Sequence, residues 1–104
     1  MITVIETHTR KEDDPMTMKL KNHPYAQCHV EIRNNSVEFV SYSTSVIEIN
    51  NNWLRCSGLY SMTTRKQIGW FLKEYAPMIS YQMVRACYAG DMQINIATGE
   101  IVPL

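Results

Sequence analysis

The sequence predicts an α+β fold: an antiparallel β-meander sheet packed on one face by two consecutive α-helices, with a short C-terminal hairpin. Three observations predict it. Apolar and polar side chains alternate over much of residues 26–56, which is the period of half-buried strands. Residues 64–89 change to the period of amphipathic helices. Two Asn-Asn pairs, at 34–35 and 51–52, supply turns because Asn tolerates positive φ.

The composition indicates one small globular domain over residues 1–104. The chain is 45% hydrophobic and has a formal net charge of zero. It therefore lacks the basic excess of a general nucleic-acid binder. No apolar run approaches the ~20 residues that span a bilayer, and residues 1–6 are too short for the apolar part of a signal peptide. We expect a cytoplasmic protein that does not contact a membrane.

The N-terminal quarter predicts two strands separated by a loop. Residues 1–6 are rich in β-branched side chains, and the charged run at 10–14 ends at Pro15. Residues 16–20 alternate with the period of a strand. His23-Pro24 ends that strand, because the residue before a proline is confined to extended or turn geometry.

The first Asn-Asn turn fixes the register of a hairpin. It places Val30 opposite Phe39, so that apolar side chains share one face. It also places Glu31 opposite Glu38, an unfavourable pair that Arg33 is positioned to compensate.

The second Asn-Asn turn predicts another antiparallel hairpin. Ile49 then faces Leu54, while Glu48 faces Arg55 on the other side of the strands. A slip of one residue would destroy both matches, so this register is well specified.

Two helices and a hairpin complete the chain. Ser61 or Thr63 can cap a first helix over residues 64–75, and a second covers 79–89 and stops at Gly90. A hairpin through Thr98-Gly99 follows. The expected inward stripes are Ile68, Phe71, Leu72 and Tyr75 on the first helix, and Ile79, Met83, Ala86 and Cys87 on the second. The order of the strands does not follow from these patterns.

The outer face of the first helix is the main candidate binding surface. Arg65 and Lys66 in its first turn oppose the helix dipole, so capping alone does not explain them. Together with the nearby hydroxyls they form either an anion site or a capped helix start with solvated charges. Trp70 lies opposite the apolar stripe, flanked by Lys66 and Lys73. Trp70 is either an exposed hot spot or core covered by the N-terminal segment.

A second candidate surface is aromatic. Trp53 projects with Glu48 and Arg55, and Tyr42 and Val40 share the corresponding face of the preceding hairpin. They form either an exposed patch, for a partner or for a homodimer, or a small second core.

The sequence does not predict catalysis, a metal or a cofactor. Cys28 and His29 are adjacent on a strand and point to opposite faces, so they cannot easily share an ion. Nothing places a histidine beside a cysteine as a nucleophile–base pair. The three cysteines are expected to be reduced.

The stretch from residue 40 to 75 resembles a family of small uncharacterised proteins carried in bacterial and phage genomes. The resemblance rests on a Y-x-T-x-V strand, a G-x-Y-S-x-T-T-R-K helix start and a W-F-L helix core. The matching residues are Tyr42, Thr44, Val46, Gly58, Tyr60, Ser61, Thr63, Thr64, Arg65 and Lys66. The resemblance implies a mobile-element context, in which small proteins often inhibit host defence, as anti-CRISPR proteins do by binding a Cas effector.

We therefore expect a non-enzymatic binding protein with a host protein as its partner, for example a CRISPR-associated nuclease. The expected surface consists of Arg65, Lys66, Trp70 and Lys73, with Trp53 second. The alternative is a nucleic-acid-binding accessory protein that uses the same basic and aromatic helix.

Overall fold

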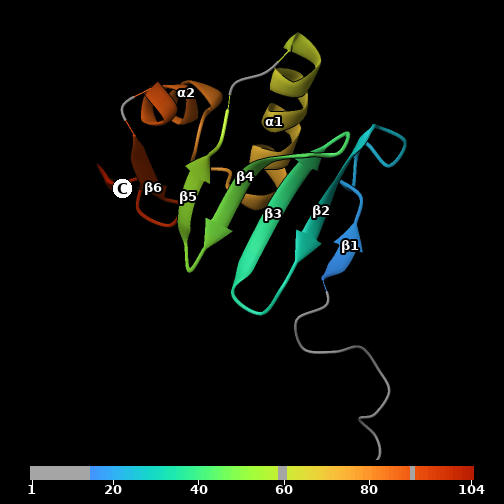
Figure 1. The fold of residues 1–104 in the computed structure, drawn as a ribbon, viewed down its shortest axis with the longest axis horizontal. Helices are drawn as coiled ribbons and strands as arrows, with labels where there is room; N and C mark the ends of the chain where they lie inside the picture. Colours follow the sequence, from blue (N-terminus) through green and yellow to red (C-terminus); the bar gives the residue numbers. More distant parts are fainter. Residues whose placement is uncertain (1–14, 59–60, 90) are drawn as a thin grey trace, which may run out of the picture.

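The computed structural model describes residues 15–58, 61–89 and 91–104. Seven strands form one sheet in chain order, and every neighbouring pair is antiparallel (Figure 1). The predicted α+β meander is thereby confirmed, whereas the strand expected at 1–6 and the loop expected at 10–14 lie outside the described residues. The elements are β1 (Met16–Met18), β2 (Cys28–Ile32), β3 (Ser36–Ser41), β4 (Thr44–Asn50), β5 (Trp53–Cys56), α1 (Met62–Tyr75), α2 (Tyr81–Ala89), β6 (Met92–Asn95) and β7 (Ile101–Pro103).

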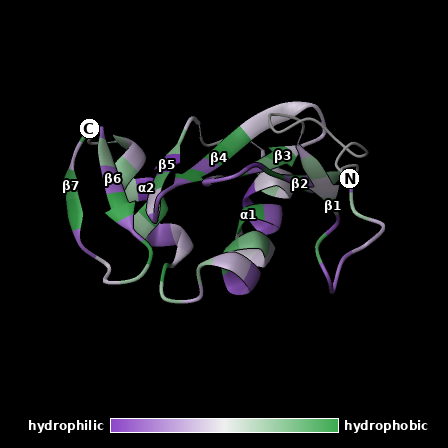
Figure 2. Ribbon diagram, turned by 90° about the horizontal axis from the view of Figure 1, so that it is seen from below, coloured by the Kyte–Doolittle hydropathy of each residue, from purple (hydrophilic) through white to green (hydrophobic). Residues whose placement is uncertain are grey.

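Both helices lie on the same face of the sheet (Figure 2). No helix of the described residues covers the other face, which we call the uncovered face. α1 packs on β3, where the rings of Phe39 and Phe71 stack with centroids 4.8 Å apart. α2 packs on β5 and β6. Apolar side chains from the inner sheet face, from both helices and from Leu20 form one hydrophobic core between these layers.

The two predicted registers are correct. Val30 pairs with Phe39 and Glu31 with Glu38. In the next hairpin, Glu48 pairs with Arg55 and Ile49 with Leu54. Positive φ angles occur at Asn51 and Asn52, as expected for a tight hairpin turn.

The first turn differs in its geometry. Asn34 and Asn35 connect β2 to β3, but neither has a positive φ. The N–H of Arg33 donates to the carbonyl of Ser36 and closes the turn, at 2.9 Å. Asparagine is therefore not required there for its backbone conformation.

The capping residue of α1 is Ser61, with a φ of −69° and a ψ of 169°. Its side chain accepts a hydrogen bond from the Thr64 N–H. The helix consequently begins two residues before the predicted start. Its inward stripe is as predicted, although Tyr75 is only half-buried.

The predicted stripe of α2 is partly wrong. Val84 and Cys87 are its buried residues, whereas Ala86 is exposed and Met83 half-buried. Ile79 of the predicted stripe is buried but precedes the helix, which begins at Tyr81 rather than at residue 79, so it does not mark the inward face of α2. The expected stop at residue 90 lies outside the described residues.

The C-terminal hairpin returns to the sheet after both helices. β6 pairs with β5, placing Leu54 beside Ile94, and β7 forms the far edge. Gly99 in the connecting turn has a φ of 80°, which favours glycine.

Candidate binding surface

The outer face of α1 is defined by what the helix buries on its inner face. Ile68, Phe71 and Leu72 are almost completely buried against the sheet. A helix with 3.6 residues per turn then turns the remaining side chains outward. The three cations of the predicted surface, Arg65, Lys66 and Lys73, are all exposed.

Trp70 is half-buried and is covered on one ring face by the segment between β1 and β2. The imidazole of His23 stacks on its indole with ring centroids 3.6 Å apart and 8° between the planes. Leu20, from the same segment, is buried in the core. The N–H of Lys21 donates to a carboxylate oxygen of Glu74 at 2.9 Å. Trp70 is therefore neither a fully exposed hot-spot residue nor a fully buried core residue, because it contacts the core and remains partly accessible.

Two hollows meet at Trp70. The first, which we name the apolar hollow, has a volume of about 330 Å³ and is lined by Met62, Thr63, Lys66 and Trp70. The second, which we name the basic hollow, has a volume of about 300 Å³ and is lined by Lys21, Asn22, His23, Trp70, Lys73 and Glu74. Both are at the small end for ligand pockets, so each suits a single side chain better than a cofactor.

Arg65 is exposed but lines neither hollow. The predicted cluster is therefore split: the structure brings Lys66 and Lys73 to Trp70, and it leaves Arg65 beside them on the helix surface.

The hydroxyls at the start of α1 have structural roles. Ser61 caps the helix, and the side chain of Thr64 is buried within 3.2 Å of the Ser41 hydroxyl at the end of β3. Ser41 also donates to Gln67, which is buried as well. This network ties the helix to the sheet and explains the serine and second threonine of the motif. Tyr60 of the motif lies outside the described residues.

Trp53 does not belong to the same surface. Its strand register directs it with Arg55 toward the uncovered face of the sheet, away from α1. It sits at the turn after β4, whereas Tyr42 follows β3 at the opposite end of that strand. The seven residues of β4 separate them by roughly 20 Å. Of the two alternatives for Trp53, Tyr42 and Val40, a single exposed patch is therefore wrong, since Val40 is also buried.

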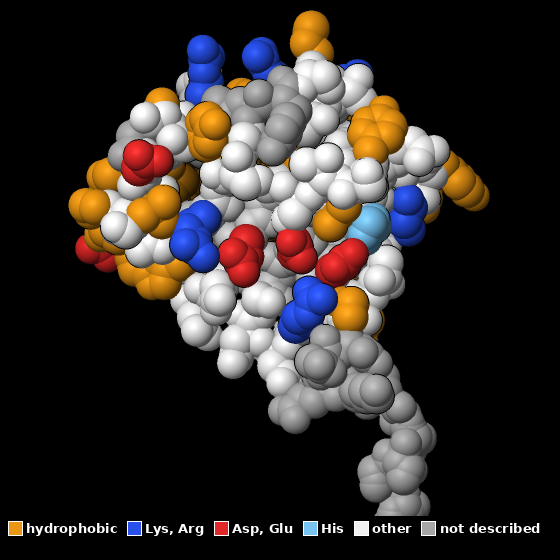
Figure 3. All heavy atoms as spheres, viewed as in Figure 1, with side chains coloured by type: hydrophobic (Ala, Val, Ile, Leu, Met, Phe, Trp, Pro, Cys, Tyr) orange, Lys and Arg blue, Asp and Glu red, His pale blue; other side chains and the backbone are white. Residues whose placement is uncertain are grey.

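The uncovered sheet face carries a band of charged side chains, visible across the middle of Figure 3. Glu31, Glu38 and Glu48 lie side by side on β2, β3 and β4. A guanidinium nitrogen of Arg33 lies 3.9 Å from a carboxylate oxygen of Glu31 and 3.6 Å from one of Glu38, as the sequence predicted. A guanidinium nitrogen of Arg55 lies 3.3 Å from a carboxylate oxygen of Glu48.

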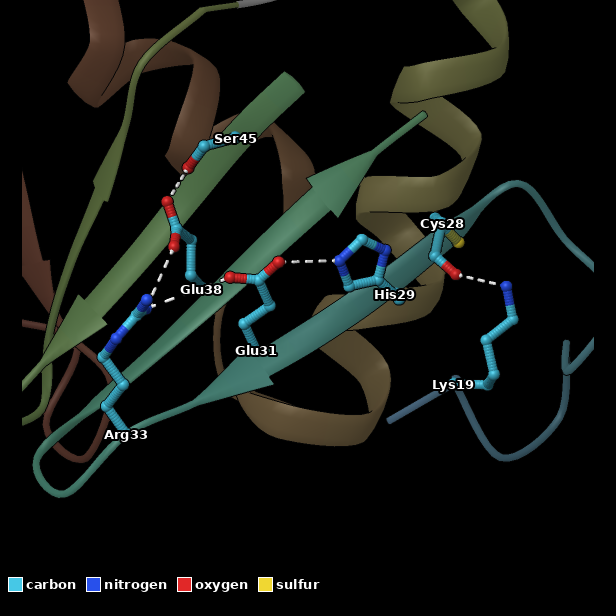
Figure 4. Close-up of polar contacts among 7 residues, drawn as sticks. All are labelled: Lys19, Cys28, His29, Glu31, Arg33, Glu38 and Ser45. Atoms are coloured by element: carbon cyan, nitrogen blue, oxygen red, sulfur yellow. Dashed lines mark hydrogen bonds and ion pairs between the residues drawn. The ribbon is translucent and has the colours of Figure 1, made fainter. Parts of the chain in front are cut away.

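Further polar contacts complete this band (Figure 4). His29 Nε2 lies 3.0 Å from Glu31, the hydroxyl of Ser45 donates to Glu38, and the ammonium of Lys19 donates to the Cys28 carbonyl. The charges of this face largely satisfy one another, which is typical of a solvated sheet face.

The three thiols are unpaired. Cys28 and Cys87 are buried and Cys56 is half-buried. Burial raises the pKa of each thiol above its ordinary value, which keeps it protonated and weakly nucleophilic. Within the described residues, histidine, cysteine and carboxylate side chains do not form a group of three that could hold a metal ion.

Lys21, Asn22, His23 and Glu74 were not predicted as part of the surface. The bond between Lys21 and Glu74 joins residues 53 positions apart. Because local periodicity carries no information about such a contact, only the expectation that the N-terminal segment folds over Trp70 pointed toward it.

A family model matches residues 14–87, from just before β1 almost to the end of α2. The chain therefore belongs to this family, which is described as a family of unknown function, DUF8033. The match includes every described residue of both hollows, whereas the hairpin formed by β6 and β7 lies beyond it. Comparison with curated proteins and with solved structures gives no match.

Among the described residues, neither helix has the length and apolar character needed to cross a membrane.

Proposed function

We propose that this protein is a non-enzymatic cytoplasmic binding protein that engages a partner protein through the outer face of α1. The observation that carries the proposal is Trp70, a half-buried tryptophan shared by two hollows, with Lys66 at the apolar hollow and Lys21 and Lys73 at the basic hollow. Tryptophans that combine anchoring in the protein with an accessible rim are enriched among binding hot spots. The uncovered sheet face supports the choice indirectly, because its charges are already paired with one another.

The partner's identity rests on the sequence resemblance. That resemblance to small mobile-element proteins favours a host defence effector, such as a CRISPR-associated nuclease, and this identity stays a prediction. The nucleic-acid alternative draws on the same lysines. It is weakened by His23, which occupies one face of the indole on which a base would stack.

A capture experiment with matched variants tests the proposal. Tagged wild-type protein and the Lys66→Glu/Lys73→Glu variant are used side by side in lysate of the host cell, and captured proteins are identified by mass spectrometry. We expect one protein to be enriched by the wild type, lost with the double variant and retained with Arg85→Glu. Arg85 is an exposed cation on α2 that lines neither hollow. The purified partner must then bind directly.

If the double variant still captured this protein, the proposal that the partner binds to the outer face of α1 would be contradicted. Oligonucleotide binding that falls steeply with salt would favour the alternative function, since phosphate contacts release counterions.

A further inference from the structure

The two hollows beside Trp70 differ in chemistry. The apolar hollow is lined by Met62, a residue that is 81% exposed, together with Trp70 and Lys66. Methionine is flexible and polarisable, and it adapts to apolar groups of different shapes. An exposed surface of this kind gains from covering by a large apolar side chain.

The basic hollow offers donors and positive charge. Lys21 and Lys73 are exposed cations at its wall, and Asn22 and His23 add polar side chains. Among its described lining residues the one carboxylate, that of Glu74, already accepts a hydrogen bond from the N–H of Lys21. The hollow is therefore lined by two lysines and by one described carboxylate that already accepts a hydrogen bond, an arrangement that favours an anionic group.

The spacing of the hollows follows from the helix. Lys66 and Lys73 are two turns apart on α1, and with a rise of 1.5 Å per residue they are separated by roughly 10 Å along the axis. Trp70 lies between them as a shared wall. A single segment of a partner can thus fill both hollows with two of its side chains.

We infer that the partner of the α1 face presents a large apolar side chain and an acidic side chain about 10 Å apart, the first in the apolar hollow and the second in the basic hollow. This inference rests on the proposed function and deepens it by stating the chemistry of the recognised segment. Charge complementarity selects the acidic group, since the described cations of the two hollows outnumber their single carboxylate.

Selection from a random peptide library displayed on phage tests the inference with the intact protein. The expected consensus contains an apolar residue and an Asp or Glu within two helical turns. Binding of the consensus peptide is then measured by fluorescence anisotropy. Replacing its acidic residue by the amide should weaken binding to the wild type about tenfold, because hydrogen bonds to charged groups are strong. The same change in the peptide should have little effect on its binding to the Lys21→Gln/Lys73→Gln variant of the protein.

Two further variants separate the hollows from the rest of the surface. Thr63→Arg fills the apolar hollow from an exposed position, so the fold is retained while binding falls about tenfold. Arg85→Gln removes a cation elsewhere and should leave binding unchanged. Circular dichroism confirms that each variant is folded.

The outcomes distinguish this inference from the proposed function. If Thr63→Arg abolishes binding of the selected peptides but the peptides show no preference for an acidic residue, the inference is overturned and the proposed α1 binding surface is retained. Peptides insensitive to all of the α1 variants overturn both. A library that yields no binder, or an oligonucleotide that competes for the same face, overturns the inference of a linear acidic and apolar segment.

Discussion

The imidazole of His23 lies flat on the indole of Trp70, with ring centroids 3.6 Å apart and 8° between the planes. The contact fastens the segment between β1 and β2 to the outer side of α1. It also leaves Trp70 half-buried, so that the residue serves the fold and the candidate surface together.

The stack should be measurable as a coupling energy. We expect Trp70→Ala to lower the free energy of unfolding by about 1–3 kcal/mol, less than for a fully buried tryptophan. His23→Ala should cost about 1 kcal/mol, and the double variant should cost less than the sum by about 0.5–1.5 kcal/mol. Urea unfolding followed by circular dichroism measures all three.

A second histidine, His29, provides the control for this double-mutant comparison. His29 is half-buried on the uncovered sheet face, away from Trp70. His29→Ala combined with Trp70→Ala should therefore be additive. Strict additivity of His23→Ala with Trp70→Ala would show that the rings do not support one another.

The buried network at the start of α1 predicts a sharp difference between two serines. Ser41→Ala removes the hydroxyl that donates to Gln67 and lies against Thr64, leaving buried polar groups without that partner. The expected cost is about 1–3 kcal/mol. Ser43 is exposed two residues later, and its replacement by alanine should change the free energy of unfolding by less than about 0.5 kcal/mol. Equal thermal midpoints for the two variants would refute a structural role for the network.

For one other buried hydroxyl, that of Tyr81, we expect removal not to lower the free energy of unfolding. The hydroxyl of Tyr81 is buried and has no hydrogen-bond partner among the described residues. Tyr81→Phe removes this polar atom while keeping the ring, so the free energy of unfolding should stay the same or rise by up to about 1 kcal/mol. Tyr88→Phe, at an exposed position of the same helix, should have no effect. A loss of more than about 1 kcal/mol in Tyr81→Phe would reveal a partner for the hydroxyl.

Stability should fall at alkaline pH. Burial raises the pKa of the thiols of Cys28, Cys56 and Cys87 above its ordinary value, and burial together with the charge of Glu74 raises the pKa of Tyr75 in the same way. The unfolded chain then releases these protons at a lower pH than the folded protein does. Their contribution is fully present below the unfolded thiol pKa of about 8.5 and is lost as the pH rises through the folded values.

Urea unfolding at several pH values between about 7 and 10 tests this dependence. Cys56→Ala changes the most accessible of the three thiols and should reduce the alkaline decline. A free energy of unfolding that stays constant to pH 10 would contradict the expected shifts.

The hairpins could be predicted because their information is local. A side-chain period of two leaves only one register at each Asn-Asn turn, and Glu31 opposite Glu38 followed from counting residues. The return of β6 to β5 could not be predicted, since Leu54 and Ile94 are joined across two helices. The burial of Ala86 was predicted wrongly because the predicted stripe included Ile79, which precedes α2 and does not share its helical period.

In the candidate site, too, local features could be predicted from the sequence and long-range contacts could not. The sequence identified Lys66, Trp70 and Lys73 because they share one helix, and periodicity orders the faces of a helix. It did not identify the wall formed by Lys21, Asn22 and His23. That wall depends on how a loop crosses α1, and such a contact leaves no periodic pattern.

The order of the strands has a consequence for how the chain folds. Each described strand pairs with its neighbour in sequence, and among these pairs only β5–β6 must bring together residues about forty positions apart. Hairpins form within microseconds, whereas closing a long loop carries a larger entropic cost. We expect the β5–β6 pair to be the last part of the sheet to form and to limit the folding rate. The short β6–β7 hairpin would then act as the closing element, added after the layers on either side of the core have met.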